Sequence, residues 1–402
     1  LARSIDPSQM VVYPHPSSFS LAAARLGWPL QDVVSLSLHG RPLDLIRPHL
    51  HAGARILALT SDERGPTLLA ALLTQAGFGI SIITVLEALG GPDERVRSQV
   101  AMSFGLEDIN PLNICAVSVV ALPQARLLPL APGLADDLFE HDGQITKREV
   151  RALTLSALAP RRSELLWDIG AGSGSVGIEW LLADPSLRAI AVEADPARAA
   201  RISRNAGAFG VPDLAITIGR APEALAGLEP PHAIFIGGGG SEPGVLEAAI
   251  AALRPGGRLV ANAVTLELEA LLLARHAELG GSLTRIEIAR ALAQQFGHQR
   301  HGARLAGRIE RGTAGEDEFQ GHEGDRMFLD QPSGMPVRRG HVLDLDGLRG
   351  EWQGERQSEG EGGGEADHSP LSASGRAWSR NRRPWATSGI SRTTWCCIAT
   401  TR

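Results

Sequence analysis

A glycine-rich turn near the middle of the chain combines residue types that can bind a nucleotide-like cofactor. The stretch LLWDIGAGSGSVGIEWLLA places Gly170, Ala171, Gly172, Ser173 and Gly174 between an apolar run and a helical pattern. Glycine lets the backbone of such a turn approach a ligand closely, and the free amide groups at the start of the following helix attract a polar or negatively charged group. The turn therefore predicts a cofactor-binding loop.

An acidic residue follows at the spacing that ribose recognition requires. The next apolar run ends in AVEAD, which places Glu193 nineteen residues after Gly174. A carboxylate at this position can accept hydrogen bonds from both hydroxyls of a ribose. Two cofactors fit this arrangement. S-adenosylmethionine suits a D-x-G-x-G-x-G loop that begins at Asp168, and a dinucleotide suits the G-x-G-x-x-G pattern of Gly172, Gly174 and Gly177.

Three features favour S-adenosylmethionine. Asp168 belongs to the loop itself, a second glycine turn, IGGGG, occupies residues 236–240, and RPGG at 254–257 leads into an expected strand. This combination is typical of class I methyltransferases. An NAD-type dehydrogenase is the alternative function, and glycines that serve only a tight turn are the structural alternative. Because methyl transfer from a sulfonium is an in-line displacement that needs positioning and desolvation, the sequence predicts no particular catalytic residue.

Polar residues just before the first helix of this region stand near the expected cofactor cleft. Thr146 and Glu149 form a T-x-x-E capping box, and a capping residue at the mouth of the cleft can also touch the ligand. His141, Asp142 and His232 could move protons, but lone polar residues beside a linker or a strand are more often structural.

From residue 146 to residue 293 the chain alternates between strands and helices in the order of a doubly wound, Rossmann-like α/β domain. We expect helices at 147–159, 175–183, 196–208, 221–227, 242–253 and 266–279, and strands at 165–170, 189–195, 214–219, 232–238, 258–264 and 284–290. Such an arrangement would place the glycine turn and Glu193 at the carboxyl edge of one sheet.

The rest of the chain divides into three parts. Residues 1–130 alternate short apolar runs, beginning with MVVYPHP, with helical patterns, which predicts βαβ units and a largely parallel sheet. Residues 131–145 are rich in Pro, Leu and Gly and are interpreted as a linker. Residues 294–402 have sparse apolar residues of no regular period, which predicts a low-complexity tail, either disordered or out of frame, without a function.

Composition excludes several classes of function. The 402 residues carry a formal net charge of −6, so the chain lacks the basic field that gathers nucleic acid. No run approaches the roughly 18 apolar residues that span a bilayer, and the expectation is a cytoplasmic enzyme without a membrane partner. Of the 3 cysteines, Cys115 is isolated and Cys396 and Cys397 are adjacent, which supports neither a disulfide framework nor a metal site.

In order and spacing, several motifs resemble the decarboxylating precorrin-6Y methyltransferases, a family of cobalamin biosynthesis. Five segments resemble the C-terminal half of that family, namely DLFEHDGQITKREVRALTLSAL, WDIGAGSGSVGIEW, GRAPEAL, AIFIGGGG and LRPGGRLVANAVTLE. Three segments resemble the N-terminal half of the family, namely SFSLAAARLGWPLQDVVSLSLHGRP, LTSDERGPTLLAALL and LEALGGPDERV. Together the two matches cover nearly all of residues 10–291.

The resemblance implies a cofactor, a substrate and a site. The C-terminal region would use S-adenosyl-L-methionine to methylate carbon 15 of a precorrin, a small-molecule tetrapyrrole, and would release the ring C acetate carboxyl as carbon dioxide. The N-terminal region would methylate carbon 5. Thr146, Gly170 to Gly174, Glu193 and Ala221 would line the cofactor pocket. Relatives of the C-terminal domain are expected to associate, which is compatible with a homo-oligomer.

Three departures from the family pattern qualify these implications. The match begins near Val11, so the first subdomain of the tetrapyrrole methylase fold, with its G-D-P segment, is absent from this sequence. A partial tetrapyrrole methylase α/β domain is therefore expected, without the half of the cofactor cleft that carbon-5 methylation uses in the family. Arg220 stands where many class I methyltransferases place an acid against the adenine amine. The pattern also stops at about residue 291, which predicts that the final strand is lost and a sheet edge is left unpaired.

Overall fold

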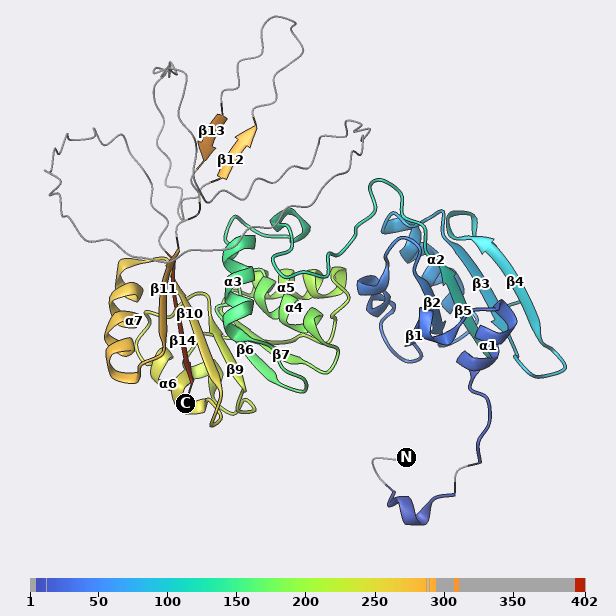
Figure 1. Ribbon diagram of the computed structural model, residues 1–402, viewed down its shortest axis with the longest axis horizontal. Coiled ribbons are helices and arrows are strands. Elements are labelled where there is room, and N and C mark those ends of the chain that lie inside the picture. Colours follow the sequence, from blue (N-terminus) through green and yellow to red (C-terminus); the bar gives the residue numbers. More distant parts are fainter. Residues whose placement is uncertain are drawn as a thin grey trace, which may run out of the picture. The chain divides into compact units, whose positions relative to one another are not determined.

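The computed structural model describes residues 5–11, 13–286, 288, 290–293, 307–310 and 395–401. These residues form an α/β structure with two main sheets, one of five strands and one of seven (Figure 1). None of the helices among the described residues has both the length and the apolar character needed to cross a membrane. Short 3₁₀ helices lie at Pro7–Gln9, Leu30–Asp32, Leu43–His49, Ala101–Ser103, Asp136–Leu138 and Glu223–Leu225.

The five-stranded sheet has the order β1-β2-β5-β3-β4. Its strands are β1 Val33–Ser37, β2 Arg55–Leu59, β3 Ile82–Glu87, β4 Arg95–Val100 and β5 Asn113–Ser118. Only β1 and β2 pair in parallel, whereas β5 pairs antiparallel with both β2 and β3, and β4 pairs antiparallel with β3. The prediction of a largely parallel sheet is therefore wrong.

The βαβ unit that misled this prediction is nevertheless present. Helix α2, Gly65–Gln75, connects β2 to β3. These two strands are not neighbours, because β5 lies between them and runs the other way. Helix α1, Ser18–Leu26, also forms as expected, with Ser17 as its N-cap. The expected strand at MVVYPHP is wrong, since the described residues between 10 and 16 adopt neither helix nor strand. Its two prolines, Pro14 and Pro16, cannot donate to a ladder.

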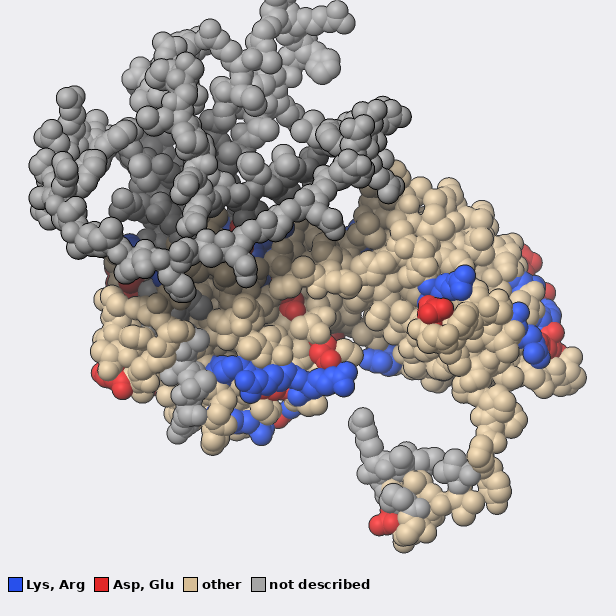
Figure 2. Space-filling model, in the orientation of Figure 1, with Lys and Arg blue, Asp and Glu red and all other residues tan. Residues whose placement is uncertain are grey.

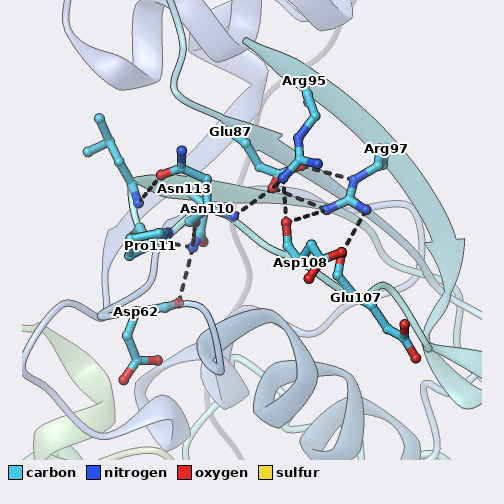
Figure 3. A network of polar contacts seen from close by, with 10 residues as sticks. Asp62, Glu87, Arg95, Arg97, Glu107, Asp108, Asn110, Pro111 and Asn113 are labelled. Carbon is cyan, nitrogen blue, oxygen red and sulfur yellow. Dashed lines mark hydrogen bonds and ion pairs between the residues drawn. The ribbon is translucent and has the colours of Figure 1, made fainter. Parts of the chain in front are cut away.

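A buried carboxylate fixes the edge strand β4 to β3 (Figure 3). The side chain of Glu87 is fully buried and forms ion pairs with Arg95 at 2.9 Å and Arg97 at 3.0 Å. The amide of Asn110 also donates to Glu87 across 2.7 Å. Burial by itself would raise the pKa of Glu87, but the hydrogen bonds from Arg97 and Asn110 and the charges of both arginines lower it. Each acceptor is thus satisfied, as a buried charge requires.

The seven-stranded sheet has the order β11-β14-β10-β9-β6-β7-β8. Its strands are β6 Leu165–Ile169, β7 Arg188–Glu193, β8 Ala215–Ile218, β9 Ala233–Ile236, β10 Arg258–Ala263, β11 Ser282–Ile286 and β14 Trp395–Thr401. The neighbouring strands β8, β7, β6, β9 and β10 all pair in parallel. Strand β14 is antiparallel to both of its neighbours, β10 and β11. The carboxyl ends of the parallel strands therefore meet at one edge, where ligands bind in doubly wound folds.

Alternate residues of the central strands face two separate cores. On one face, Leu166, Ala191 and Phe235 pack with residues of α3 Arg148–Leu158, α4 Ser175–Ala183 and α5 Pro196–Ala208. On the other face, Trp167 and Ile234 pack with residues of α6 Val245–Ala252 and α7 Leu266–Leu279. Helices thus cover both faces of the sheet (Figure 1). Six helices were expected here, but residues 221–227 form only the 3₁₀ turn at Glu223–Leu225.

The segment predicted to be a linker, residues 131–145, is packed into the first of these cores. Leu134, Phe139 and Ile145 are buried there. The amides of Gly133 and Leu134 donate to the carboxylate of Glu179 on α4 across 2.7 and 3.0 Å. That carboxylate also pairs with the fully buried Arg151. The linker boundary is wrong because apolar residues without a regular period can still bury against a neighbouring helix pair.

The tail prediction is also wrong for its last described segment. β14 lies between β10 and β11, with Ala399 opposite both Val260 and Ser282. The sheet edge that was expected to be unpaired is thereby filled. A further short pair, β12 Arg290–Ala293 and β13 Gly307–Glu310, is antiparallel. The remainder of residues 294–402 lies outside the described residues.

Candidate cofactor site

The glycine turn lies between the end of β6 at Ile169 and the start of α4 at Ser175, as predicted. Gly170, Gly172 and Gly174 have φ values of 68°, 60° and 75°, in the region that favours glycine. A Cβ at Gly170 would lie 2.7 Å from the Cα of Gly238. The loop therefore needs glycine at position 170 for its backbone conformation and for its packing against the IGGGG turn after β9.

The carboxylate of Glu193, at the end of β7, binds the loop directly. The amide of Gly172 donates to Oε2 of Glu193 across 2.8 Å, and the amide of Asp195 donates to Oε1 across 3.0 Å. Glu193 is 6% exposed, so its carboxylate is almost completely buried. Two predicted site residues, the loop glycine and the acid, are thus brought together. Each carboxylate oxygen retains a lone pair that could accept a further hydrogen bond.

Two buried oxygen atoms beside the loop have no hydrogen-bond partner among the residues that the structure describes. Oδ2 of Asp168 accepts a hydrogen bond from the amide of Gly177 across 2.9 Å, whereas its Oδ1 and the Oγ of Ser173 are unpartnered. Both residues are 1% exposed. Burial raises the pKa of Asp168 to about 7, the hydrogen bond from Gly177 opposes this rise, and the charge of Glu193 adds to it. Unsatisfied buried acceptors beside a glycine loop fit a ligand that carries hydrogen-bond donors.

Thr146 lies in the segment that leads into α3, but its predicted role as an N-cap is wrong. The N-cap is Lys147, and its side chain makes no capping hydrogen bond. The carbonyl of Thr146 instead accepts a hydrogen bond from Arg151, which draws the segment toward the first turn of the helix. The same segment passes close to the glycine loop, because a Cβ at Gly172 would lie 3.7 Å from the carbonyl oxygen of Gln144.

Two arginines of α5 bind Asp142, which precedes Thr146 in the same segment. Asp142 pairs with Arg198 and Arg201, each at 3.0 Å. Burial by itself would raise the pKa of Asp142, but these arginines and the amide of Gln144 lower it to about 2. Basic side chains with acidic ones beside them are visible on the face shown in Figure 2. Asp142 is therefore a structural anion, as the sequence favoured.

Both candidate histidines also make structural contacts. Nδ1 of His141 accepts a hydrogen bond from the amide of Gly143 across 3.0 Å, and Nδ1 of His232 accepts one from the amide of Leu165 across the same distance. In each case the ring nitrogen completes a turn or a strand end. These contacts satisfy backbone donors of a turn and of a strand.

Ala221 follows the end of β8, on the same edge of the sheet. The amide of Gly219 donates to the carbonyl of Glu193 across 3.0 Å, so the chain that leads to Ala221 starts beside the acid. Ala221 is partly buried against the core on the α6 side. Its neighbour Arg220 pairs with Glu242 at 3.5 Å, and both side chains are exposed.

Sequence reasoning missed one polar residue of this region. Asn205 of α5 is 2% exposed and bonds both to the segment before α3 and to the glycine loop. A signal was present, because Asn205 interrupts the buried stripe of Ala199, Ile202, Ala206 and Phe209 at helical spacing. A polar residue on such a stripe must find partners inside the protein.

The strand order and the site together define the class. A dinucleotide-binding sheet of the doubly wound type has six parallel strands in the order 3-2-1-4-5-6. This sheet has an antiparallel seventh strand, β14, inserted beside β10. With a glycine loop that begins at Asp168 and an acid at the end of β7, the fold is that of a class I methyltransferase, the enzymes that take a methyl group from S-adenosyl-L-methionine.

Comparisons with known proteins narrow the class to a family. The model of a precorrin methyltransferase domain matches residues 137–303. A precorrin-6Y C(5,15)-methyltransferase [decarboxylating] from Sinorhizobium sp is 67% identical over 291 residues, which cover 72% of this chain and 70% of that protein. The chain therefore belongs to the family of decarboxylating precorrin-6Y C(5,15)-methyltransferases. The dehydrogenase alternative has no support among these relatives.

Two further proteins are similar to parts of this chain. A probable cobalt-precorrin-6B C(15)-methyltransferase (decarboxylating) from Pyrobaculum calidifontis is 42% identical over 141 residues, which cover 34% of this chain and 72% of that protein. The solved C-terminal domain of precorrin-6Y C5,15-methyltransferase from Rhodobacter capsulatus is 49% identical, with a TM-score of 0.39, and the match covers 45% of this chain and 96% of that domain.

Proposed function

We propose that this chain transfers a methyl group from S-adenosyl-L-methionine to carbon 15 of a precorrin-6Y-type tetrapyrrole, and that it releases the carboxyl of the ring C acetate as carbon dioxide. The observation that carries the proposal is the glycine loop fixed to Glu193, with the unpartnered oxygens of Asp168 and Ser173 beside it. Family membership supplies the substrate, because the relatives are named for this tetrapyrrole and for decarboxylation.

The loop side of the site would hold the amino-acid part of the cofactor. Oδ1 of Asp168 is an acceptor for the ammonium group, whose positive charge would favour the ionised carboxylate against the opposing effect of burial. The hydroxyl of Ser173 can donate to the cofactor carboxylate. Gly170, Ala171, Gly172 and Gly174 would form the backbone cradle, which a larger side chain at Gly170 would obstruct.

The remaining predicted residues would surround the nucleoside. Glu193 would accept hydrogen bonds from the ribose hydroxyls with the lone pairs that Gly172 and Asp195 do not use. The backbone at Ala221 would serve the adenine edge, because Arg220 offers no acid there. Thr146 would close the site from the segment before α3, which already passes the glycine loop.

The chemistry needs positioning more than proton transfer. Bound S-adenosyl-L-methionine supplies an electrophilic methyl group, and the electron-rich ring carbon is the nucleophile, so the new bond forms at carbon 15 as the sulfonium bond breaks. The bond to the acetate carboxyl then breaks, its electron pair passes into the ring imine system and carbon dioxide leaves. A proton taken up at the former acetate carbon completes the methyl group on ring C. The protein contributes alignment and exclusion of water.

The carbon-15 step is assigned to the seven-stranded sheet. The Pyrobaculum relative is named for carbon 15 and decarboxylation alone, and its match covers 34% of this chain. A match of 141 residues would fit within the region around this sheet, residues 137–303, which the precorrin methyltransferase domain model matches. We therefore propose that the reaction at carbon 15 does not need the five-stranded sheet.

Calorimetric titration of the full chain with S-adenosylhomocysteine tests the cofactor part of the proposal. We expect saturable binding, with no comparable binding of NADH. The Glu193→Gln variant should bind more weakly, whereas Glu278→Gln, which changes an exposed residue of α7, should bind as the wild type does. Binding of NADH alone, or no binding of either compound, would contradict the proposed function.

A further inference from the structure

Asn205 connects two parts of the chain that flank the cofactor site. Its Oδ1 accepts a hydrogen bond from the amide of Glu140 across 2.9 Å. Its Nδ2 donates to the carbonyl of Glu140 and to the carbonyl of Ser173, each also across 2.9 Å. One side chain of α5 thus binds the segment that leads to Thr146 and, at the same time, the glycine loop.

These three bonds fix the orientation of the side-chain amide. An amide N–H can only meet an acceptor, and a carbonyl can only meet a donor, so Oδ1 must face the amide of Glu140 and Nδ2 must face the two carbonyls. Asparagine supplies one acceptor and two donors within a short, rigid group. An aspartate of the same shape would retain the acceptor and place a negative oxygen against two carbonyls. Because Asn205 is buried, water cannot replace the lost donors.

We propose that Asn205 is a positioning residue for the cofactor site, which holds residues 140–146 against the loop of residues 170–174 so that both contact S-adenosyl-L-methionine together. The inference rests on the proposed function, because the proposed function identifies S-adenosyl-L-methionine as the cofactor. Asn205 acts through the carbonyl of Ser173 and through the backbone of Glu140. The side-chain amide of Asn205 therefore couples the conformation of the glycine loop to the conformation of residues 140–146.

The other contacts between α5 and this segment cannot substitute for the amide. Arg204 pairs with the carboxylate of Glu140 at 2.6 Å, but the two side chains are 57% and 51% exposed. Exposed pairs of this kind contribute little. Arg198 and Arg201 bind Asp142, which lies further along the segment and outside the glycine loop. Asn205 alone among these four bonds to Ser173.

The test compares Asn205→Asp and Asn205→Ala with two control variants in the full chain. We expect S-adenosylhomocysteine to bind about tenfold more weakly to both Asn205 variants, and the KM for the methyl donor to rise by a similar factor while kcat changes less than about twofold. Arg204→Ala, which breaks the exposed pair with the same Glu140, should leave the Kd within about twofold of the wild type.

A second control separates positioning from stability. Leu187→Ala creates a cavity in the same core at the amino edge of the sheet, away from the site, and should lower Tm without weakening S-adenosylhomocysteine binding. If the Asn205 variants lose stability but bind within about twofold of the wild type, the inference fails while the proposed function stands. A wild-type chain that does not bind S-adenosylhomocysteine overturns both.

Hydrogen exchange in the wild type provides a readout that needs no variant to fold. Saturating S-adenosylhomocysteine should slow exchange in the peptide that contains residues 140–146 as well as in the peptide that contains residues 170–174. In Asn205→Asp at saturation, only the loop peptide should be protected. Protection of the loop without any change at residues 140–146 in the wild type would refute the coupling.

Discussion

The carboxylate of Glu193 accepts a hydrogen bond from the amide of Gly172 across 2.8 Å, so the acid that would bind the ribose also anchors the cofactor loop. The second oxygen accepts a hydrogen bond from the amide of Asp195, the N-cap of α5. A single side chain therefore links β7, the glycine loop and the start of the next helix. Its removal should affect cofactor binding twice, through the lost ribose contact and through a looser loop.

Glu193→Gln should weaken S-adenosylhomocysteine binding by about tenfold to a hundredfold. The amide can still accept at one oxygen, but it loses the charge and presents a donor to one of the two backbone amides, and a hydrogen bond to a charged group is worth about 1.5–3 kcal/mol. Isothermal titration measures the change. An affinity within about twofold of the wild type would show that Glu193 does not contact the cofactor.

Asp168 should make cofactor binding and stability depend on pH in opposite directions. Its pKa is raised from 3.8 to about 7, so the folded chain holds a proton there that the unfolded chain releases between these values. Stability contributed by the neutral form is present below pH 3.8 and is lost as the pH rises toward about 7. Affinity for S-adenosylhomocysteine should instead rise over the same range, because the ionised carboxylate attracts its ammonium group.

Asp168→Asn isolates this effect. The variant should unfold at a higher temperature than the wild type at about pH 8, where the buried charge costs a few kcal/mol, and the difference should shrink toward about pH 5. Its S-adenosylhomocysteine affinity should be about tenfold lower at about pH 8 and should lose most of its pH dependence. Parallel pH profiles for the two proteins would contradict the role of this carboxylate.

Gly170→Ala should distort the cofactor loop. The new Cβ would lie 2.7 Å from the Cα of Gly238, at a φ of 68° that alanine seldom adopts. We expect a loss of more than about 2 kcal/mol in the free energy of unfolding, together with loss of S-adenosylhomocysteine binding. Gly256→Ala is the matched control, because its φ is 74° and nothing lies within 4 Å of its Cβ. It should cost only about 1 kcal/mol and leave binding intact.

Removal of β14 should open the seven-stranded sheet. Six backbone positions of β10 and five of β11 face this strand. A chain cut before Trp395 would leave two edges unpaired, and we expect a lower Tm and concentration-dependent aggregation in light scattering. Ala399→Pro removes one backbone donor from the middle of β14 and should act in the same direction, but more weakly. A Tm unchanged by both would show that β14 does not support the sheet.

The elements that bury a regular apolar stripe could be predicted from the sequence. The helices Ser175–Ala183, Pro196–Ala208 and Leu266–Leu279 have the predicted bounds. In Pro196–Ala208 the buried residues recur at helical spacing and Asp195 caps the first turn, so period and terminal signal agree there. The edge strand Arg95–Val100 was missed since its residues are mostly exposed and include two arginines. The place of β14 in the sheet depends on long-range pairing that no local pattern reveals, because β14 lies more than a hundred residues beyond β11 in the chain.

The part of the site that one continuous motif contains, the glycine turn and the acid, could be predicted from the sequence. The contacts between residues far apart in the chain could not. Gly170 to Gly174 and Glu193 follow from spacing along the chain, and the structure joins them. The capping role of Thr146 failed because helix α3 begins after Lys147. Asn205 bonds to Glu140, 65 positions earlier in the chain, so its partners could be found only after folding.

The central claim is tested most directly by counting both products of one turnover. The full chain is incubated with precorrin-6Y and S-adenosyl-L-methionine that carries an isotopic label in its methyl group, and the label at carbon 15 and the released carbon dioxide are measured together. The account predicts equal amounts of the two, both strongly reduced in Glu193→Gln. Bound S-adenosylhomocysteine without labelled product, or methyl transfer to carbon 15 without carbon dioxide, would contradict it.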